Sequence, residues 1–253
     1  MLLQILFFIL GLAVGSFLNV VIFRFPEMKG ILSGRSKCPR CKKPIAAYDL
    51  IPILSFLLLW GRCRYCRKRI SLQYPIVELT TGLLFLAFAR VFGLSWMLVT
   101  YLIIGALSIL IFVSDVKYLE IPEVFSWLLL IMAMIAAIVS GTFSLSSFLL
   151  GGLVGGGILG ILVGISNERW MGSGDIKIGL AFGFLFGFYK ALLFLFLAFV
   201  IGALVGILLM AVKKKQMKSE IAFSPFLIIA AIVAIFWGDY LVNLYLKFVI
   251  ISL

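Results

Sequence analysis

Apolar runs of about 20 residues recur along almost the whole chain, and no other feature restricts the fold as strongly. A helix of that length crosses a hydrocarbon core about 30 Å thick. Of the 253 residues, 64% are apolar and 13% are charged, and the mean hydropathy is +1.24. A water-soluble domain is about half apolar and about a quarter charged. The sequence therefore predicts an all-α polytopic membrane protein.

We expect about eight transmembrane helices, at residues 2–23, 76–92, 95–114, 123–140, 145–165, 176–188, 190–212 and 222–246. The sixth is the least distinct, because residues 176–212 carry only Lys177 and Lys190 as charges. We place a tight turn near residues 188–190, and one long tilted helix is the alternative. Small residues suit close helix packing in lipid, and one predicted span is rich in them: Gly151, Gly152, Gly155, Gly156, Gly157 and Gly160.

The basic residues are distributed unevenly between the two ends of these helices, which predicts the orientation of the chain. Of 22 Lys and Arg residues, 12 fall in residues 24–75, four in 213–220 and three in 114–121 and 166–177, so 19 lie on one side. The positive-inside rule places that side in the cytoplasm and both termini outside. The net charge of +12 is therefore interpreted first as a sign of orientation.

The expected organisation is a first transmembrane helix (1–23), a small cytoplasmic Cys-rich domain (24–75) and a transmembrane domain (76–253). The first segment resembles a signal peptide, but it is too long and its charges begin after it, at Arg24, so we expect a retained span. An apolar stretch at residues 50–60 is too short to span. We expect it to lie at the membrane interface or to pack within the small domain.

Four cysteines form two CxxC pairs, Cys38 with Cys41 and Cys63 with Cys66, separated by 21 residues. Four thiolates at tetrahedral reach suit zinc. Because the orientation places them in the reducing cytoplasm, a structural zinc site in a zinc-ribbon-like fold is favoured over disulfides. Reduced or redox-active thiols are the alternative. A site closed by four cysteines organises a fold and performs no catalysis.

Zinc ribbons among basic residues also occur in proteins that bind nucleic acid. Here the aromatic residues between the basic ones are too few for a base-stacking platform, and orientation already accounts for the charge. We therefore expect no nucleic-acid partner. The chain also has no histidine, which excludes nucleophile pairs and zinc sites that need imidazole, so its chemistry must come from carboxylates and cysteines.

Two of the aspartates stand at the ends of apolar spans. Asp115 closes the third predicted span, and Asp175 opens the sixth within the run Gly172-Ser-Gly-Asp175. An ionisable residue at membrane depth indicates function by default, whereas a helix cap at the interface is the plainer interpretation of either residue alone. Gly172 and Gly174 would let the backbone beside Asp175 approach a partner closely.

Two carboxyl groups held close together in a poorly solvated place cannot both ionise, so one keeps a proton. The ionised carboxylate can activate water, and the protonated one can donate to a scissile carbonyl. Peptide hydrolysis needs no metal on this scheme. The competing class is a transporter or ion-pathway protein, in which paired intramembrane aspartates also occur, although no inverted repeat is visible.

Five blocks in order resemble the bacterial type IV prepilin leader peptidase and N-methyltransferase family. They are residues 15–24 (GSFLNVVIFR), the paired CxxC segment with residues 48–52 (YDLIP), residues 74–78 (YPIVE), Asp115 with Pro122, and residues 172–177 (GSGDIK). The resemblance implies a GxGD-type intramembrane aspartic peptidase of the bacterial inner membrane, with Asp115 and Asp175 as its catalytic pair. Its substrates would be type IV prepilins and pseudopilins, cut after the glycine of a short basic leader at the cytoplasmic face.

The resemblance also implies a second activity, methylation of the new N-terminal amine from S-adenosylmethionine. Gly61 and Arg62 match the family's Gly-Lys/Arg before the third cysteine, which is implicated in that step. No glycine-rich loop typical of S-adenosylmethionine binding is visible, so methyl transfer rests on the resemblance alone. The chain departs from the family at residues 222–225 (AFSP), where relatives usually carry Pro-Phe-Gly-Pro, and this places Ser224 at a glycine position.

Overall fold

A computed structural model of the chain describes residues 2–25, 36–140, 144–212 and 222–251. The chain divides into two compact units, residues Met1–Leu110 and Ile111–Leu253, and the division falls inside helix α4 (Trp96–Tyr118). The basic segment 213–220, which contributes to the predicted orientation, lies outside the described residues. Each unit is helical, and the described residues contain no strand beyond two isolated bridges.

In the first unit, helices α1 (Leu2–Arg24) and α3 (Gln73–Phe92) pack along each other. Helix α3 ends at Gly93, whose φ of 58° is a conformation that glycine adopts without strain. The chain turns there into α4, and the two helices are joined by aromatic rings: Tyr101 lies 4.2 Å from Phe92 and 5.7 Å from Phe88, centroid to centroid. Within this unit, the apolar runs read from the sequence therefore form a helical core.

The cysteine-rich segment between α1 and α3 has little regular structure. It contains the short 3-10 helix η2 (Ala47–Leu50) and the five-residue helix α2 (Leu54–Leu58), neither of which buries a residue. Two tight turns at the CxxC pairs account for most of the remaining hydrogen bonds in this segment. The expected zinc-ribbon-like domain is therefore present as paired turns between the first two long helices.

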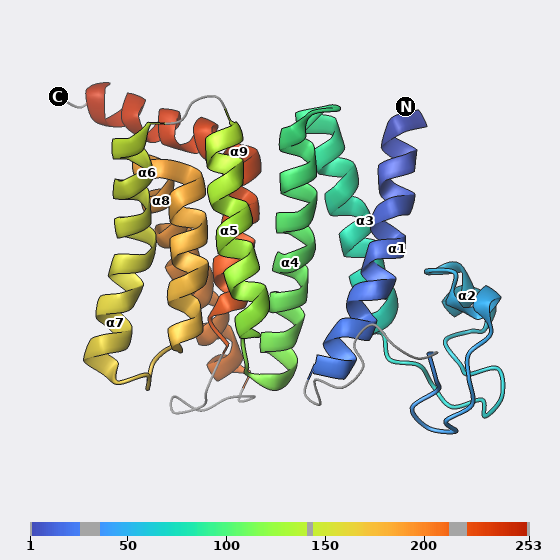
Figure 1. Cartoon of the computed structure of the whole chain (residues 1–253). Helices are drawn as coiled ribbons and strands as arrows, with labels where there is room; N and C mark the ends of the chain where they lie inside the picture. The colour runs from blue at the N-terminus through green and yellow to red at the C-terminus, as the bar shows by residue number, and fades with distance from the viewer. Residues whose placement is uncertain (1, 26–35, 141–143, 213–221, 252–253) are drawn as a thin grey trace. The chain divides into compact units, whose positions relative to one another are not determined.

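The second unit is built around helix α8 (Ser173–Ala211), which contacts every other described helix of the unit from α5 onward. These are α5 (Glu123–Val139), α6 (Leu145–Gly152), the π-helical stretch η3 (Leu153–Gly157), α7 (Ile158–Ser166) and α9 (Ser224–Ile251). Figure 1 shows α5 to α9 running alongside one another, coloured from yellow-green to red. Helix α8 is therefore the central helix of this unit, and the other helices pack against it.

Helix α8 is two arms folded back on each other, not one rod. Gly187 leaves the helical conformation (φ 68°, ψ −178°). The rings of Phe182 and Phe194 lie 5.7 Å apart, although 12 helical residues would separate them by about 18 Å along a straight axis. The tight turn predicted near residues 188–190 is therefore confirmed, one residue earlier than expected, and the single long helix is wrong.

Close helix packing through glycine is confirmed for four of the six residues that the sequence indicates. A side chain at Gly155 would collide with the carbonyl oxygen of Gly179 on α8, and Gly151, Gly152 and Gly156 meet α8 equally closely. Gly157 and Gly160 make no such approach to a neighbouring helix. Backbones that touch in this way maximise van der Waals contact where lipid supplies no hydrophobic driving force.

Six of the described helices are long and apolar enough to cross a membrane: α1, α3, α4, the continuous run of α6 to α7, α8 and α9. Helix α5 is apolar but shorter, at 17 residues. Because α8 contributes two arms, these elements supply the eight crossings that the sequence predicts. The boundaries differ from prediction most at α9, which continues to Ile251 instead of ending at residue 246, and at α4, which continues to Tyr118 instead of ending at residue 114.

Candidate active site

The two aspartates that the sequence singles out are buried in the second unit. Asp115 lies one turn before the end of α4 and is 5% exposed, and Asp175 lies in the first turn of α8 and is 3% exposed. Neither forms an ion pair with a basic side chain of the described residues. Such burial exceeds what a helix cap at a membrane surface requires, because a cap keeps its carboxylate in contact with water.

The fold brings Asp115 and Asp175 to the same end of the second unit. After Asp115 the chain turns at Leu119, whose N–H donates to the Asp115 carbonyl oxygen over 2.8 Å, and then enters α5. The start of α5 meets the start of α8, where Lys177 Nζ lies 2.8 Å from Glu123 Oε1. The two carboxyl groups are close enough for their charges to interact.

The glycines before Asp175 differ in what they do. A side chain at Gly174 would come within 2.9 Å of the Ile121 side chain, so a glycine there permits the close approach that the sequence predicts. A side chain at Gly172 would meet no neighbouring helix among the described residues. Gly174 alone therefore lets the first turn of α8 sit against the segment that follows Asp115.

The surroundings of the two carboxyl groups are unequal. Ser224, the first residue of α9, is fully buried, and its hydroxyl donates to Asp115 Oδ2 over 2.6 Å. The backbone N–H of Ser224 is a second donor to the same carboxyl group. In contrast, Asp175 Oδ1 is buried without a hydrogen-bond partner among the described residues. Ser224 therefore supplies two donors to the Asp115 carboxyl group, whereas the Asp175 carboxyl group has one backbone donor, from Gly172.

The four cysteine thiols of the first unit converge on one point. All four sulfur atoms lie within 4.8 Å of one another, and Cys38 Sγ is 3.9 Å from Cys66 Sγ. Four sulfurs in tetrahedral contact with zinc, each about 2.3 Å from the ion, lie roughly 3.8 Å apart. The cluster therefore has the dimensions that a tetrahedral metal site requires.

The two CxxC turns have the same local structure. In the first, Lys42 N–H donates to the Cys38 carbonyl over 2.8 Å, and in the second, Arg67 N–H donates to the Cys63 carbonyl over 2.9 Å. Both donors have positive φ, 57° and 58°. Burial raises the pKa of the Cys38 thiol, but hydrogen bonds from the backbone of Cys41 and Arg40 outweigh it and lower that pKa to about 7. A thiol that ionises near neutral pH is suited to bind a metal ion.

The chain matches two family models and several individual proteins. Residues 9–92 match the model of the bacterial peptidase A24 N-terminal domain, and residues 102–207 match that of the type IV leader peptidase family. A protein of Bacillus subtilis (strain 168) named prepilin leader peptidase/N-methyltransferase is 33% identical over 95% of this chain and 96% of its own length. The chain belongs to the type IV leader peptidase family.

Other relatives carry the same name. That of Aeromonas hydrophila is 32% identical over 95% of this chain and 93% of its own length, and that of Pseudomonas aeruginosa is 30% identical over 95% and 92%. No solved structure gives a significant match. As a type IV leader peptidase family member, the chain is an enzyme, and its multi-pass helices indicate a membrane enzyme. The transporter alternative has no support from these matches.

The residues that the resemblance connects with methyl transfer stand at the turn before the second CxxC pair. Gly61 has a φ of 64°, and a side chain there would come within 2.9 Å of the Phe56 ring. Arg62 is exposed, and its backbone pairs with that of Arg69 in an isolated antiparallel β-bridge. Neither residue lines the cavity between α1 and residues 50–52. In this family member, the conformation of the turn is by itself sufficient reason for a glycine at residue 61.

Three polar residues of this peptidase acquire structural partners that sequence reasoning did not foresee. Ser224 was noted only as a departure from the family's glycine, and its contact with Asp115 depends on α9 reaching the end of α4. The Glu78 carboxylate accepts a hydrogen bond from the Ile53 N–H over 2.8 Å. Lys177 pairs with Glu123 and lies 5.2 Å from the centre of the Trp127 ring.

Proposed function

We propose that Asp115 and Asp175 are the catalytic pair of a membrane-embedded aspartic endopeptidase that removes the leader from type IV prepilins or pseudopilins. The observation that carries this proposal is the convergence, within one unit, of two buried aspartates from different helices with unequal surroundings. The names of the relatives support the substrate class. Two carboxyl groups of unequal charge state are what acid and base catalysis of peptide hydrolysis requires.

The hydrogen bonds of Ser224 support a division of roles between the two aspartates on this proposal. Asp115 holds the negative charge and takes a proton from the attacking water, while Asp175 holds the shared proton and donates it to the carbonyl oxygen of the scissile bond. The tetrahedral intermediate then collapses as Asp115 passes its proton to the departing amine nitrogen. Asp175 recovers a proton from the hydroxyl of the new acid. Both groups return to their starting state, and no metal ion takes part.

The position of the pair fits a substrate that straddles the membrane surface. We place the described turns at Leu119 and Asn167 on the cytoplasmic side of a bacterial inner membrane, with both termini outside, because the basic residues gather on that side. A short basic leader would remain in the cytoplasm, and the apolar stem would lie in the bilayer. The bond between them, after the leader's glycine, would then reach the aspartates at the helix ends.

Zinc would be held by Cys38, Cys41, Cys63 and Cys66, whose sulfur atoms have the required spacing. When bound, such an ion supplies a structural cross-link between the two CxxC turns and no catalysis. The segment around the two CxxC turns has little regular structure of its own. A metal cross-link would therefore stabilise its fold.

Methyl transfer from S-adenosylmethionine is proposed from the relatives' names, with Gly61 and Arg62 as the residues that the resemblance connects with it. Gly61 has a φ of 64° and lies against the Phe56 ring, and Arg62 is exposed. On this proposal residues 24–75 are the methyltransferase region, residues 76–253 are the peptidase domain and residues 1–23 are the first membrane helix.

The test is incubation of the detergent-solubilised protein with a prepilin, followed by measurement of product masses with and without S-adenosylmethionine. We expect Asp115→Asn and Asp175→Asn each to lower cleavage by about 100-fold or more, because each removes a proton-transfer group. Asp239→Asn is the matched control, since that residue is exposed and pairs with Lys190. Near-normal cleavage by either active-site variant would remove that residue from the pair, and failure of a folded wild type on several prepilins would reject the peptidase.

A further inference from the structure

The short helix α2 and its flanks expose apolar surface that a water-soluble domain would bury. Helix α2 buries none of its residues, and six large apolar side chains of the stretch 50–60 are exposed: Leu50, Ile51, Leu54, Leu57, Leu58 and Trp60. The last two are 78% and 89% exposed. The stretch contains no charged residue. An apolar patch of this kind marks a surface that contacts something other than water.

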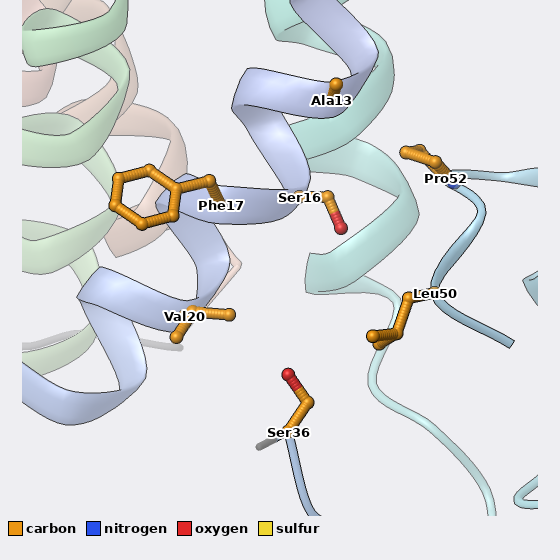
Figure 2. A pocket seen from close by; sticks show the side chains of 7 residues that line it. All are labelled: Ala13, Ser16, Phe17, Val20, Ser36, Leu50 and Pro52. Atoms are coloured by element: carbon orange, nitrogen blue, oxygen red, sulfur yellow. The ribbon is translucent and has the colours of Figure 1, made fainter. Parts of the chain in front are cut away.

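The same stretch lies alongside a membrane helix, not beyond its end. Leu50 and Pro52 line one cavity, of about 290 Å³, together with Ala13 and Ser16 of α1, and Figure 2 shows these side chains facing one another. Ala13 precedes Arg24, the last residue of α1, by 11 residues, or about 16 Å along the helix. Half of a hydrocarbon core is about 15 Å thick. Residues 50–52 therefore lie at bilayer depth if α1 spans the membrane.

Most backbone N–H groups of this stretch have a partner within the protein. A polar backbone group inside a bilayer must find its partner within the protein. The N–H groups of residues 54, 55, 57, 59, 60 and 61 each donate to a carbonyl oxygen of the same stretch. Ile53, whose φ is 60°, cannot do so, and its N–H donates instead to Glu78 of α3 over 2.8 Å. Glu78 is itself 7% exposed and five residues inside α3, so this acceptor is buried.

The charges of the segment begin where the apolar stretch ends. Asp49 and Arg64 form a bidentate ion pair just outside it, with Arg64 Nη2 2.6 Å from Asp49 Oδ1. The exposed basic residues of the second CxxC turn follow: Arg62, Arg67, Lys68 and Arg69. Trp60 stands at the boundary between the two, which is where tryptophan is enriched in membrane proteins. Basic side chains beside it would meet anionic lipid headgroups.

We propose that residues 50–60 form a re-entrant segment inserted among the acyl chains of the bilayer that α1 and α3 span, in the leaflet on the Arg24 side. Glu78 fixes the segment by accepting the Ile53 N–H, and the two CxxC turns are thereby held against the membrane surface. The occupant of the apolar patch is lipid, and the proposal does not depend on the peptidase or methyltransferase activity. A second copy of the chain on the patch, or water, would contradict it.

Quenching of tryptophan fluorescence tests the proposal in reconstituted vesicles of phosphatidylcholine and phosphatidylglycerol. The five native tryptophans are replaced by phenylalanine, and one tryptophan is introduced by Leu58→Trp in the segment, by Leu83→Trp on the exposed face of α3, or by Lys68→Trp in the CxxC turn. We expect lipids brominated on their acyl chains to quench Leu58→Trp at least half as strongly as Leu83→Trp. Acrylamide should quench Lys68→Trp several-fold more than either.

Strong acrylamide quenching of Leu58→Trp, or quenching by neither reagent, would overturn the proposal, because the first means water and the second means protein on the patch. The part played by Glu78 is tested in the Leu58→Trp background. Glu78→Gln keeps an acceptor for the Ile53 N–H and should preserve the quenching by brominated lipid. Glu78→Leu removes the acceptor and should raise acrylamide quenching at least twofold; equal quenching in both variants would remove Glu78 from the proposal.

Discussion

The hydroxyl of Ser224 donates a hydrogen bond of 2.6 Å to Oδ2 of Asp115, which links the first turn of α9 to the end of α4. Hydrogen bonds to a charged group are worth about 1.5–3 kcal/mol. The contact is therefore strong enough to influence which aspartate holds the proton.

Replacement of Ser224 tests this influence on catalysis. Ser224→Ala removes the hydroxyl and keeps the backbone N–H, so we expect kcat/KM for prepilin cleavage to fall about tenfold, as loss of roughly 1.4 kcal/mol would produce. Ser224→Thr retains the hydroxyl and should restore most of the rate. Equal rates in all three proteins would show that the hydroxyl only fills space beside Asp115.

The turn between the two arms of α8 depends on Gly187. Its backbone conformation is one that only glycine occupies readily, and a side chain there would also collide with the Ser147 hydroxyl. We expect Gly187→Ala to destabilise the protein by about 1–3 kcal/mol, measured as thermal unfolding in detergent. Gly206→Ala is the control in the second arm, because a side chain there meets open space, and it should change stability little. Similar melting temperatures for the two variants would contradict the folded-back arrangement.

Loss of the metal should affect the first unit and leave peptide cleavage, which depends on the second unit, largely intact. We expect the purified wild type to retain about one zinc ion per chain by elemental analysis, and Cys63→Ser to retain much less, since three thiolates bind the ion more weakly. Tyr65→Phe, beside the same turn, should keep its zinc. Because Asp115 and Asp175 lie in the second unit, cleavage by Cys63→Ser should fall by less than about tenfold. Absence of zinc from a folded wild type would reject the site.

The ion pair between Asp49 and Arg64 predicts an acid-sensitive contact in the first unit. A hydrogen bond from Arg64 holds the pKa of Asp49 below its ordinary value. A lowered pKa in the folded state contributes stability above the unfolded value of about 3.9, and this contribution is lost as pH falls through the lowered pKa. We therefore expect limited proteolysis of the cysteine-rich segment to accelerate in wild type as pH falls below about 4.

The matched variants for this contact are Asp49→Asn and Arg64→Gln. At neutral pH each should be cleaved faster than wild type, and the double variant no faster than either single one, since all three lack the same pair. The effect should be modest, because Arg64 is 46% exposed and solvent screens the pair. A wild-type cleavage rate that does not change with pH would show that the ion pair contributes no stability.

Several features of this chain were accessible from residue order alone. The apolar runs predict their helices without knowledge of contacts, because a bilayer obliges each spanning backbone to satisfy its own hydrogen bonds. The turn near Gly187 was predicted from a single cluster of glycine and lysine. The CxxC spacing predicted a cluster of four thiols, and the sulfur atoms of Cys38 and Cys66 do lie 3.9 Å apart.

The remaining features depend on elements that are distant in the chain. The contact of Ser224 with Asp115 spans 109 residues, and that of Glu78 with Ile53 spans 25, so no local pattern contains either. The ion pair of Lys177 with Glu123 spans 54 residues and illustrates the same limit.

The sequence by itself determined that this is a helical membrane protein. It also indicated two aspartates and four cysteines as the residues available for chemistry. The length of an apolar run and the spacing of cysteines in the sequence are local properties, and they do not depend on how the helices are arranged. Only the tertiary structure decided that α9 supplies a donor to Asp115 and none to Asp175, and that Glu78 receives the backbone of a segment between two helices. The strength of a hydrogen bond depends on the distance between two atoms in space, and that distance is set by packing.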